Sequence, residues 1–322
     1  MYYELRVDNG INSFEPVVCG EVLYESYADG RCSKLSFDIL SDALNAPLNT
    51  TELAVKEGDV VSLKIGGFGA FCGVVFQRKK GSSDGTMSVV AYDQLRYLKN
   101  KDTYVYSGKR ASDVVRMIAL DYKLRQGEIK QTQYVIPHRI EDNVTLMDII
   151  GNALDLELQH SGRRFTLIDS FGHLSLQDDA GMFSGVVLDR DTVGDVCYFS
   201  SIDNRSNRVK VSRYDAKSGR REVFVAKDEH SENRLGILQH YLRIADKNET
   251  LSSRARALLS LYNKDERSIT VSGALGCAAV RGGSLVEFSL EEFMGRARAA
   301  RVVHRLSGSG HLMDIDGQLT DN

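Results

Sequence analysis

The chain has 322 residues and a formal net charge of −3, with 42% hydrophobic and 26% charged residues. This length fits two or three domains, each able to bury a core. The small net charge excludes a general attraction to nucleic acid or anionic lipid. No window approaches the roughly 18 apolar residues that a membrane-spanning helix needs.

Cysteine usage indicates a reducing compartment. The cysteines are odd in number and widely scattered, with no CxxC or Cys/His spacing: Cys19, Cys32, Cys72, Cys197 and Cys277. We therefore expect buried free thiols and no disulfide framework. The N-terminus alternates like a strand and lacks the basic start and apolar run of a signal peptide.

Residues 1–95 have the pattern of a β domain. Apolar and polar residues alternate over 35–39 and 61–65, as in half-buried strands. The glycine-rich stretch 66–69 and the segment 81–85 are typical of turns, and each leads into another apolar stretch, at 71–76 and 86–92. This order of short strands predicts a barrel or sandwich.

Residues 96–188 predict two amphipathic helices and a hairpin. One helix buries an apolar stripe made of Val114, Val115, Ile118, Ala119 and Tyr122. The other begins after Thr145, which can accept from first-turn N–H groups, and buries Leu146, Ile149, Ile150, Ala153 and Leu154. Two short strands at 164–168 and 173–176 follow. This helix, helix, hairpin order predicts a small α+β spacer domain.

Residues 189–322 return to a β pattern. Strands are expected at 207–212 and 222–226, around a turn at 215–219. One helix is expected near 248–263, burying Leu251, Ala255, Leu258, Leu259 and Tyr262. Further strands are expected at 269–271, 284–290, 297–306 and 312–315. The fold class is therefore α+β and mainly β, with two β-barrel or sandwich domains flanking the spacer.

The two β regions look like copies of one unit. Gly58, Val60, Val61 and Leu63 align with Gly283, Leu285, Val286 and Phe288. The alignment continues with Val74 and Val75 on Val302 and Val303, Met87-Ser88-Val89 on Met313-Asp314-Ile315, and KLSFDIL (34–40) on RSITVSG (267–273). Chance is a competing explanation because hairpins converge on such patterns, but the shared order of four strands favours an internal duplication.

No catalytic, cofactor or metal site follows from the motifs. Gly66-Gly67-Phe68-Gly69 lies between two strands, which favours a hairpin turn over a phosphate loop. Asp189, Asp191 and Asp195 lack calcium-loop spacing. The seven histidines form no HExxH motif and no pair at i, i+4. Cys197 is expected to be a buried structural thiol rather than a nucleophile.

Two basic stretches could bind phosphate or acidic neighbours. They comprise Arg205, Arg208, Lys210, Arg213, Lys217, Arg220 and Arg221, and then Arg296, Arg298, Arg301 and Arg305. Aromatic residues that could stack on bases are sparse in both. A solvated face or a subunit contact with acidic neighbours is therefore favoured over nucleic-acid binding.

Several runs resemble the XkdQ/YqbQ family of prophage-encoded tail proteins. They are AYDQLRYLKNK (91–101), ASD (111–113), TLMDII (145–150), SSID (200–203), GRREV (219–223) and LLSLYN (258–263). The family is similar to the baseplate hub of contractile phage tails and phage-tail-like bacteriocins. Arg110 departs from the pattern, because a small capping residue is expected before Ala111-Ser112-Asp113.

The resemblance implies a structural hub that joins a six-fold tail tube to a three-fold central spike. The implied partners are two further copies of the chain, the tube protein, the spike protein, the tape-measure protein and other baseplate proteins, without specific nucleic-acid binding or membrane insertion. Its location would be the baseplate of a virion or bacteriocin, assembled in the bacterial cytoplasm. The domains would be 1–95, 96–188 and 189–322, with tube-like β domains at both ends.

Two alternatives stay open. A tail-associated peptidoglycan hydrolase would need paired carboxylates or a zinc site in a cleft. The adjacent Glu291 and Glu292 lie in an expected hairpin loop, a poor position for a preorganised acid. A nucleic-acid-binding protein would have to use the basic hairpins.

Overall fold

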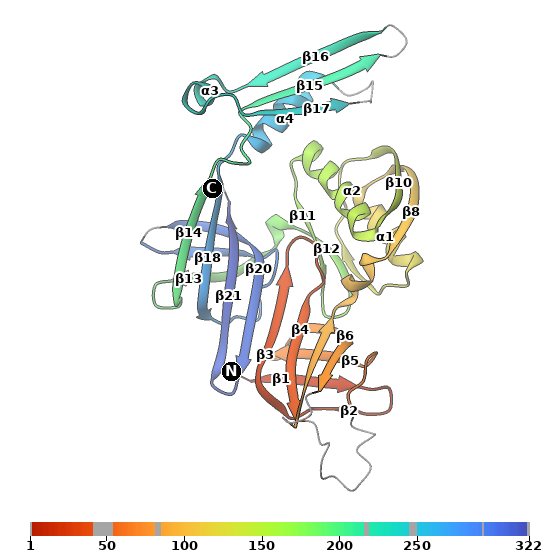
Figure 1. The fold of residues 1–322 in the computed structure, drawn as a ribbon, viewed down its shortest axis with the longest axis vertical. Coiled ribbons are helices and arrows are strands. Elements are labelled where there is room, and N and C mark those ends of the chain that lie inside the picture. Colours follow the sequence, from red (N-terminus) through yellow and green to blue (C-terminus); the bar gives the residue numbers. More distant parts are fainter. Residues whose placement is uncertain are drawn as a thin grey trace.

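The structure, a computed structural model, describes residues 2–40, 54–80, 85–215, 219–244, 250–291 and 293–320. It is mainly β, as predicted. Most strands belong to one 13-stranded sheet that runs through the N-terminal and C-terminal parts of the chain. A helical module lies beside this sheet, and a small three-stranded sheet lies at the end of the molecule away from the N-terminal part (Figure 1).

The N-terminal part of the large sheet, here called unit 1, consists of β1 to β7. Its strands are β1 (Tyr3–Asp8), β2 (Ser13–Phe14), β3 (Val18–Tyr27), β4 (Lys34–Leu40), β5 (Val60–Ile65), β6 (Phe68–Lys80) and β7 (Thr86–Tyr92). Alternating apolar residues fill its core, with Leu35, Leu63 and Ile65 fully buried. The expected turn at 81–85 lies mostly outside the described residues.

The C-terminal part, unit 2, is built from strands with an insertion between the second and third. Its strands are β13 (Phe183–Asp189), β14 (Asp195–Ser201), β18 (Glu266–Leu275), β19 (Leu285–Ser289), β20 (Met294–Ser307) and β21 (Gly310–Leu319). Val271, Val286 and Phe288 are among its buried core residues. Each unit therefore has its own hydrophobic core within the shared sheet.

The predicted duplication is visible in the strand order. Unit 1 has the order β3-β4-β7-β6-β5-β1, and unit 2 has β14-β18-β21-β20-β19-β13. The outermost strands differ, since β1 pairs with β5 antiparallel whereas β13 pairs with β19 in parallel. Neither unit closes on itself among the described residues, so there is no closed barrel there, and the predicted pair of separate barrel or sandwich domains is not confirmed. Instead, β20 of unit 2 pairs with β3 of unit 1 and makes the sheet continuous.

Strand registers correct the predicted alignment in two places. Gly58 N–H donates to the Val75 carbonyl at 2.9 Å, and Gly283 N–H donates to the Ala299 carbonyl at 2.7 Å, so Val75 corresponds to Ala299 and not to Val303. Ala91 of β7 corresponds to Gly317 of β21. Leu35 lies opposite Ala91 and Ile269 lies opposite Gly317, so Leu35 corresponds to Ile269, one residue away from the predicted β4/β18 alignment.

The predicted match of Met87 with Met313 is confirmed. Met87 lies opposite Lys80, and Met313 lies opposite His304. Met87 and Met313 occupy equivalent places because the strands that they face, β6 and β20, carry a bulge at equivalent positions, after Val75 and after Ala299. The bulges also explain the errors, because sequence spacing alone does not reveal an extra residue in a strand.

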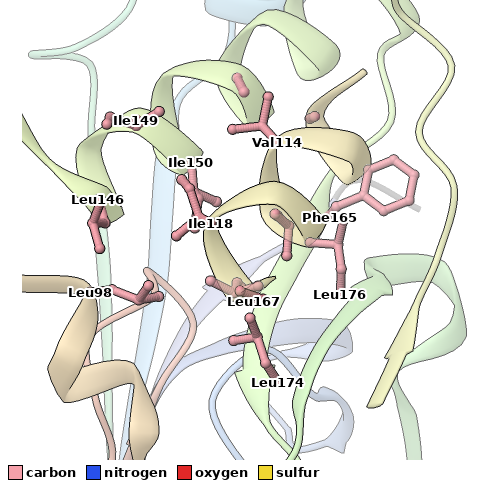
Figure 2. Close-up of a cluster of buried hydrophobic side chains, with 14 of the residues drawn as sticks. Leu98, Val114, Ile118, Leu146, Ile149, Ile150, Phe165, Leu167, Leu174 and Leu176 are labelled. Atoms are coloured by element: carbon pink, nitrogen blue, oxygen red, sulfur yellow. The ribbon is translucent and has the colours of Figure 1, made fainter. Parts of the chain in front are cut away.

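The helical module contains the predicted helices and hairpin, with further strands beside them. Its elements are the 3₁₀ helix η2 (Gln94–Lys99), β8 (Lys101–Lys109), α1 (Ala111–Asp121), β9 (Gln126–Ile129), β10 (Ile136–Thr145), α2 (Leu146–Ser161), β11 (Phe165–Asp169), β12 (Leu174–Asp178) and the 3₁₀ helix η3 (Asp179–Gly181). Side chains of α1, α2, η2 and the β11/β12 hairpin point into one shared core (Figure 2). The domain limits at residues 95 and 188 stay predictions.

Helix starts follow local capping chemistry. The Thr145 hydroxyl accepts from Asp148 N–H at 3.1 Å, as predicted for α2. Arg110 provides no side-chain cap for α1. The Asp113 carboxylate instead accepts from the Arg110 N–H at 2.9 Å, which gives the helix half of a capping box.

An inserted module lies between β14 and β18 and was not predicted as a separate layer. It consists of β15 (Arg208–Asp215), β16 (Arg220–Lys227), α3 (Glu229–Leu235), β17 (Gln239–Ile244) and α4 (Leu251–Tyr262). Its three strands form a sheet of their own, and Val209, Val211, Ala255 and Leu258 form its core. The expected helix is thus present as α4; its expected start near 248 and most of the turn at 215–219 lie outside the described residues.

The helical core gives a test of packing. Ile150 is fully buried between α1 and α2, so Ile150→Ala should lower the free energy of unfolding by about 2–5 kcal/mol because it leaves a cavity. Leu120 is 72% exposed on α1, and Leu120→Ala should change that free energy by less than about 0.5 kcal/mol. Urea unfolding of the full chain measures both, and equal losses would contradict the assigned core.

Candidate subunit interface

The junction between the two units is an antiparallel strand pair. β20 and β3 pair from Arg301 opposite Tyr27 to Leu306 opposite Val22. Just before this ladder, Ala28 N–H donates to the Ala300 carbonyl at 2.9 Å. Residues from opposite ends of the sequence thereby share one backbone ladder, and each unit continues the sheet of the other.

A glycine allows unit 2 to approach β3 closely. Gly282 N–H donates to the Ser26 hydroxyl at 2.9 Å, and both residues are within the buried junction. A Cβ atom on Gly282 would lie 2.3–2.5 Å from backbone atoms of Tyr27. No side chain fits there without moving a strand, so only glycine is compatible with this contact.

Aromatic rings fill the inner face of the junction. His304 of β20 stacks on Tyr24 of β3, with ring centroids 5.5 Å apart. His304 Nδ1 lies 2.8 Å from His311 Nε2, and His304 Nε2 lies 2.8 Å from the Val280 carbonyl oxygen. Burial, reinforced by the neighbouring His311, lowers the pKa of His304 to about 4, so its ring is neutral at physiological pH.

Ion pairs line the outer face. Arg301 Nη2 lies 2.9 Å from Glu25 Oε2 across the junction. Arg305 pairs with Asp314 of β21 at 2.8 Å and approaches Glu21 of β3 at 4.0 Å. These side chains are partly exposed, so their contribution is small beside the buried ladder.

Two arginines of unit 2 connect it to the helical module. Arg281 donates to the backbone carbonyl of Asp169 at 2.8 Å. Arg298 donates to the Thr166 hydroxyl at 2.7 Å and forms an ion pair with Asp179 at 2.5 Å. The side chain of Arg298 is only 12% exposed. The junction thus fixes three parts of the chain relative to one another.

A pair of buried carboxyl groups lies where unit 1 meets the helical module. Asp93 accepts from Ser33 N–H at 2.9 Å and from Leu95 N–H at 3.0 Å. Asp169 accepts from the Gln94 side chain at 2.8 Å and from Gly172 N–H at 2.6 Å. Burial and the nearby Asp169 raise the pKa of Asp93 to about 7, and burial also raises the pKa of Asp169.

These buried polar contacts orient the helical module on the sheet. Arg281 and Arg298 reach it from unit 2, and Asp93 and Asp169 meet on the side of unit 1. Buried polar groups are costly unless each finds its partner in the right place. They therefore fix the orientation of the module more specifically than an apolar contact of the same size.

Two strand segments of the large sheet have an edge with no described partner strand. β14 pairs with β18 on one side and with no described strand on the other. Tyr198 and Phe199 on it are 50% and 52% exposed. The end of β6, residues Gln77 to Lys80, pairs with β7 on one side and likewise meets no described strand on the other. Exposed edges with aromatic residues favour pairing with another chain.

The predicted site residues are scattered. Gly66 and Gly67 form the two-residue β5/β6 turn with φ of 57° and 85°, which confirms the hairpin interpretation. Asp189 accepts from Thr192 N–H at 3.1 Å at the end of β13. The described residues contain no group of three or more His, Cys, Asp or Glu side chains that could hold a metal ion. Glu292 lies outside the described residues.

The thiol prediction is wrong for Cys197. All five cysteines are free, and Cys32 is buried, but Cys197 is exposed on β14. Cys19, Cys72 and Cys277 are partly buried. Cys197 lies opposite Thr270 on the outer face of an edge strand, where no described partner strand or second layer covers it. The sequence pattern missed that β14 is an edge.

Most arginines of the basic stretches have acidic partners within the chain. Arg208 pairs with Glu232 and Arg205 with Asp265, both at 2.6 Å. Arg213 pairs with Glu222 at 2.6 Å, and Arg296 with Glu287 at 3.4 Å. These pairs lie within one chain, so the predicted solvated face or subunit contact with acidic neighbours stays a prediction. Lys217 lies outside the described residues.

Comparison with known proteins assigns the chain to a family. Residues 22–317 match the YQBQ-like family. The chain belongs to the YQBQ-like family. It is 31% identical over 274 residues to the phage-like element PBSX protein XkdQ of Bacillus subtilis (strain 168), covering 83% of each chain. No helix within the described ranges is both long and apolar enough to cross a membrane.

Solved structures of tail proteins share the fold of this YQBQ-like chain. A tail protein from Neisseria meningitidis MC58 superposes with a TM-score of 0.71 at 15% identity, over 99% of this chain and 97% of that one. A 43 kDa tail protein of prophage MuSo2 from Shewanella oneidensis gives 0.69 at 13% identity, over 98% of both chains. The fold is therefore one found in phage tail proteins.

The close approach at Gly282 predicts a strong effect of one methyl group. Gly282→Ala should lower the thermal midpoint by several degrees, because the added Cβ collides with the Tyr27 backbone. Gly308→Ala is the matched control, since nothing lies within 4 Å of its Cβ position. Equal midpoints for the two variants would show that the junction is looser than described.

The carboxyl pair predicts a pH dependence of stability. A raised folded-state pKa means that Asp93 favours folding when protonated, so this contribution is present near pH 4 and is lost as pH rises through about 7. His304 acts in the opposite direction, because its lowered pKa removes stability as pH falls from about 6.5 toward 4.

The difference between the wild type and Asp93→Asn separates the two effects. The thermal midpoint of the variant should rise relative to that of the wild type as pH increases from 4 to 8, because the introduced amide stays neutral. Thermal denaturation across that range measures the gain. Asp203→Asn, at an exposed position, should follow the wild type throughout. A constant offset for Asp93→Asn would contradict the raised pKa.

Proposed function

We propose that this protein is a structural hub subunit of a phage tail or a phage-tail-like particle. Its XkdQ relative belongs to a phage-like element, and its fold is shared with tail proteins. The observation that carries the proposal is the duplication, because one chain contains two β units with the same strand order, joined edge to edge.

The duplication would let one assembly meet both a six-fold and a three-fold neighbour. Three copies of a chain with two similar units present six similar β units to a six-fold tube, while the whole assembly keeps three-fold symmetry toward a spike. Cyclic closure makes such an assembly a finite ring and not a filament. The helical module and the inserted module would then lie outside the ring of β units.

The role is non-catalytic and is carried by surfaces. In the assembled particle, the partners are two further copies of the chain, the tail tube protein, the central spike protein, the tape-measure protein and other baseplate proteins. The place is the baseplate of a virion or a bacteriocin, with assembly in the bacterial cytoplasm. Neither specific nucleic-acid binding nor membrane insertion is part of this function.

Mass measurement tests the proposal. The full chain, alone and together with the spike protein encoded beside it, should assemble into complexes that contain three copies, as measured by light scattering or native mass spectrometry. A monomer under both conditions, or a complex with two or four copies, would contradict the three-fold hub. A peptidoglycan zymogram is the companion measurement, and clearing above background would overturn the non-catalytic role.

A further inference from the structure

The sheet of the inserted module has one face that the described residues leave uncovered. Its strands have the order β16-β15-β17, and α4 packs against the opposite face, where Ala255 and Leu258 share a core with Val209 and Val211. The uncovered side is here called the outer face. We infer that the outer face is a docking surface for an acidic surface of another protein. This inference goes beyond the proposed hub function and does not depend on it.

Strand pairings determine which side chains share the outer face. Successive side chains of a strand point to opposite sides, so residues directly opposite each other in neighbouring strands lie on the same side. The rows of the outer face are Lys210 with Val225 and Tyr241, Ser212 with Val223 and Arg243, and Tyr214 with Arg221. The outer face therefore combines cations, aromatic rings and branched aliphatic side chains.

Three cations of the outer face have no carboxylate partner among the described residues. They are Lys210, Arg221 and Arg243. Within residues 208–214, 221–227 and 239–244, the only acidic residue is Glu222, and it pairs with Arg213 on the opposite side of the sheet. Carboxylates from outside the chain can therefore reach these cations without displacing an internal ion pair.

The charge of the whole module points in the same direction. Residues 208–262 contain twelve Lys and Arg and seven Asp and Glu, which gives a net charge of +5. The rest of the chain carries −8, because the total is −3. This asymmetry orients an acidic partner toward the inserted module during its approach and away from the remainder of the molecule.

Two guanidinium groups of the outer face are held in place by tyrosine side chains. Arg221 donates to the Tyr241 hydroxyl at 2.6 Å, and that hydroxyl also lies 2.6 Å from the Ser212 hydroxyl. The guanidinium of Arg243 lies over the Tyr214 ring, 5.8 Å from its centroid. Arginine forks that are already positioned lose less conformational freedom when they bind a carboxylate through two hydrogen bonds.

The same contacts favour an acidic protein over nucleic acid. A guanidinium lies over each tyrosine ring, in a position that a stacking base would need. Val223 and Val225 are 45% and 42% exposed and place aliphatic surface between the cations. Carboxylates set among aliphatic side chains match this mixture of groups, whereas a row of phosphates would leave the valines without an apolar contact.

Fluorescence anisotropy with a fluorescein-labelled peptide tests the inference. The peptide is rich in Glu with interspersed Val, and it is titrated with the full chain at low ionic strength, where charges are least screened. The wild type should bind this peptide and should not bind a version with Gln in place of every Glu. Arg221→Gln combined with Arg243→Gln should weaken binding roughly fivefold, because two carboxylate contacts are lost.

A matched pair of substitutions controls for net charge. Arg220→Gln combined with Arg256→Gln removes the same charge from exposed positions outside the outer face. Arg220 precedes Arg221 in β16 and points to the opposite side of the sheet, and Arg256 lies on α4. This control pair should change the affinity for the peptide by less than about twofold. All four side chains are exposed, so both double variants should keep the thermal midpoint of the wild type.

A second substitution tests the outer face without removing an arginine. Val225 lies opposite Lys210, so Val225→Glu places a carboxylate beside that lysine from within the chain. It should weaken peptide binding at least as much as the loss of Arg221 and Arg243. Val225→Thr adds no charge and keeps a branched side chain, so it should bind the peptide within about twofold of the wild type.

The outcomes support or overturn the docking surface. Binding that the Arg221/Arg243 variant weakens and the Arg220/Arg256 variant keeps supports it. No binding by the wild type, or equal weakening by both variants, overturns it. It is also overturned if a single-stranded oligonucleotide or phosphatidylserine vesicles bind the outer face more tightly than the peptide, or if the Arg221/Arg243 variant abolishes self-association of the chain. None of these results decides the three-copy assembly that tests the hub function.

Discussion

Backbone hydrogen bonding between β20 and β3 is the constraint on which the rest of the structure depends. Without it the chain would hold two separate β units, each with an exposed strand edge. With it, β20 near the C-terminus pairs with β3 near the N-terminus, and the two units form a single sheet. Because this pairing spans nearly the whole sequence, the chain reaches its native form only when both ends have been made.

Sequence patterns predicted the elements whose causes are local. The stripes of α1 and α2, the Thr145 cap and the two-glycine turn at Gly66 depend on residues within a few positions of each other. The cap and the turn are confirmed, and so are the stripes except that Tyr122 and Leu154 are only partly buried. The duplication was also readable, because turn glycines such as Gly58 and Gly283 recur in both units with positive φ. The family assignment adds what local patterns do not contain.

Sequence patterns did not predict the features that depend on pairing between strands far apart in the chain. Nothing in the residues of β3 says that it pairs with β20, and bulges in β6 and β20 shift the register without any mark in the composition. The apolar series along β20 offers several equally good matches to Val75, which explains the error of four residues. The inserted sheet was missed because its parallel β15/β17 pair is joined through α3, a short polar helix.

Unit 1 and unit 2 differ in the side chains on the equivalent strands β6 and β20. Where β20 meets β3 the inner face carries Val302, His304 and Leu306, which are buried by the partner strand. The equivalent end of β6 has Arg78 and Lys80 instead. Arg78 pairs with Glu57 at 2.7 Å and donates to the Val55 carbonyl at 2.7 Å, whereas Lys80 is exposed. Charged residues on an exposed strand edge oppose indiscriminate pairing with other strands. A permanently covered edge has no such need, so the duplicated strands have diverged in the direction that their different exposure requires.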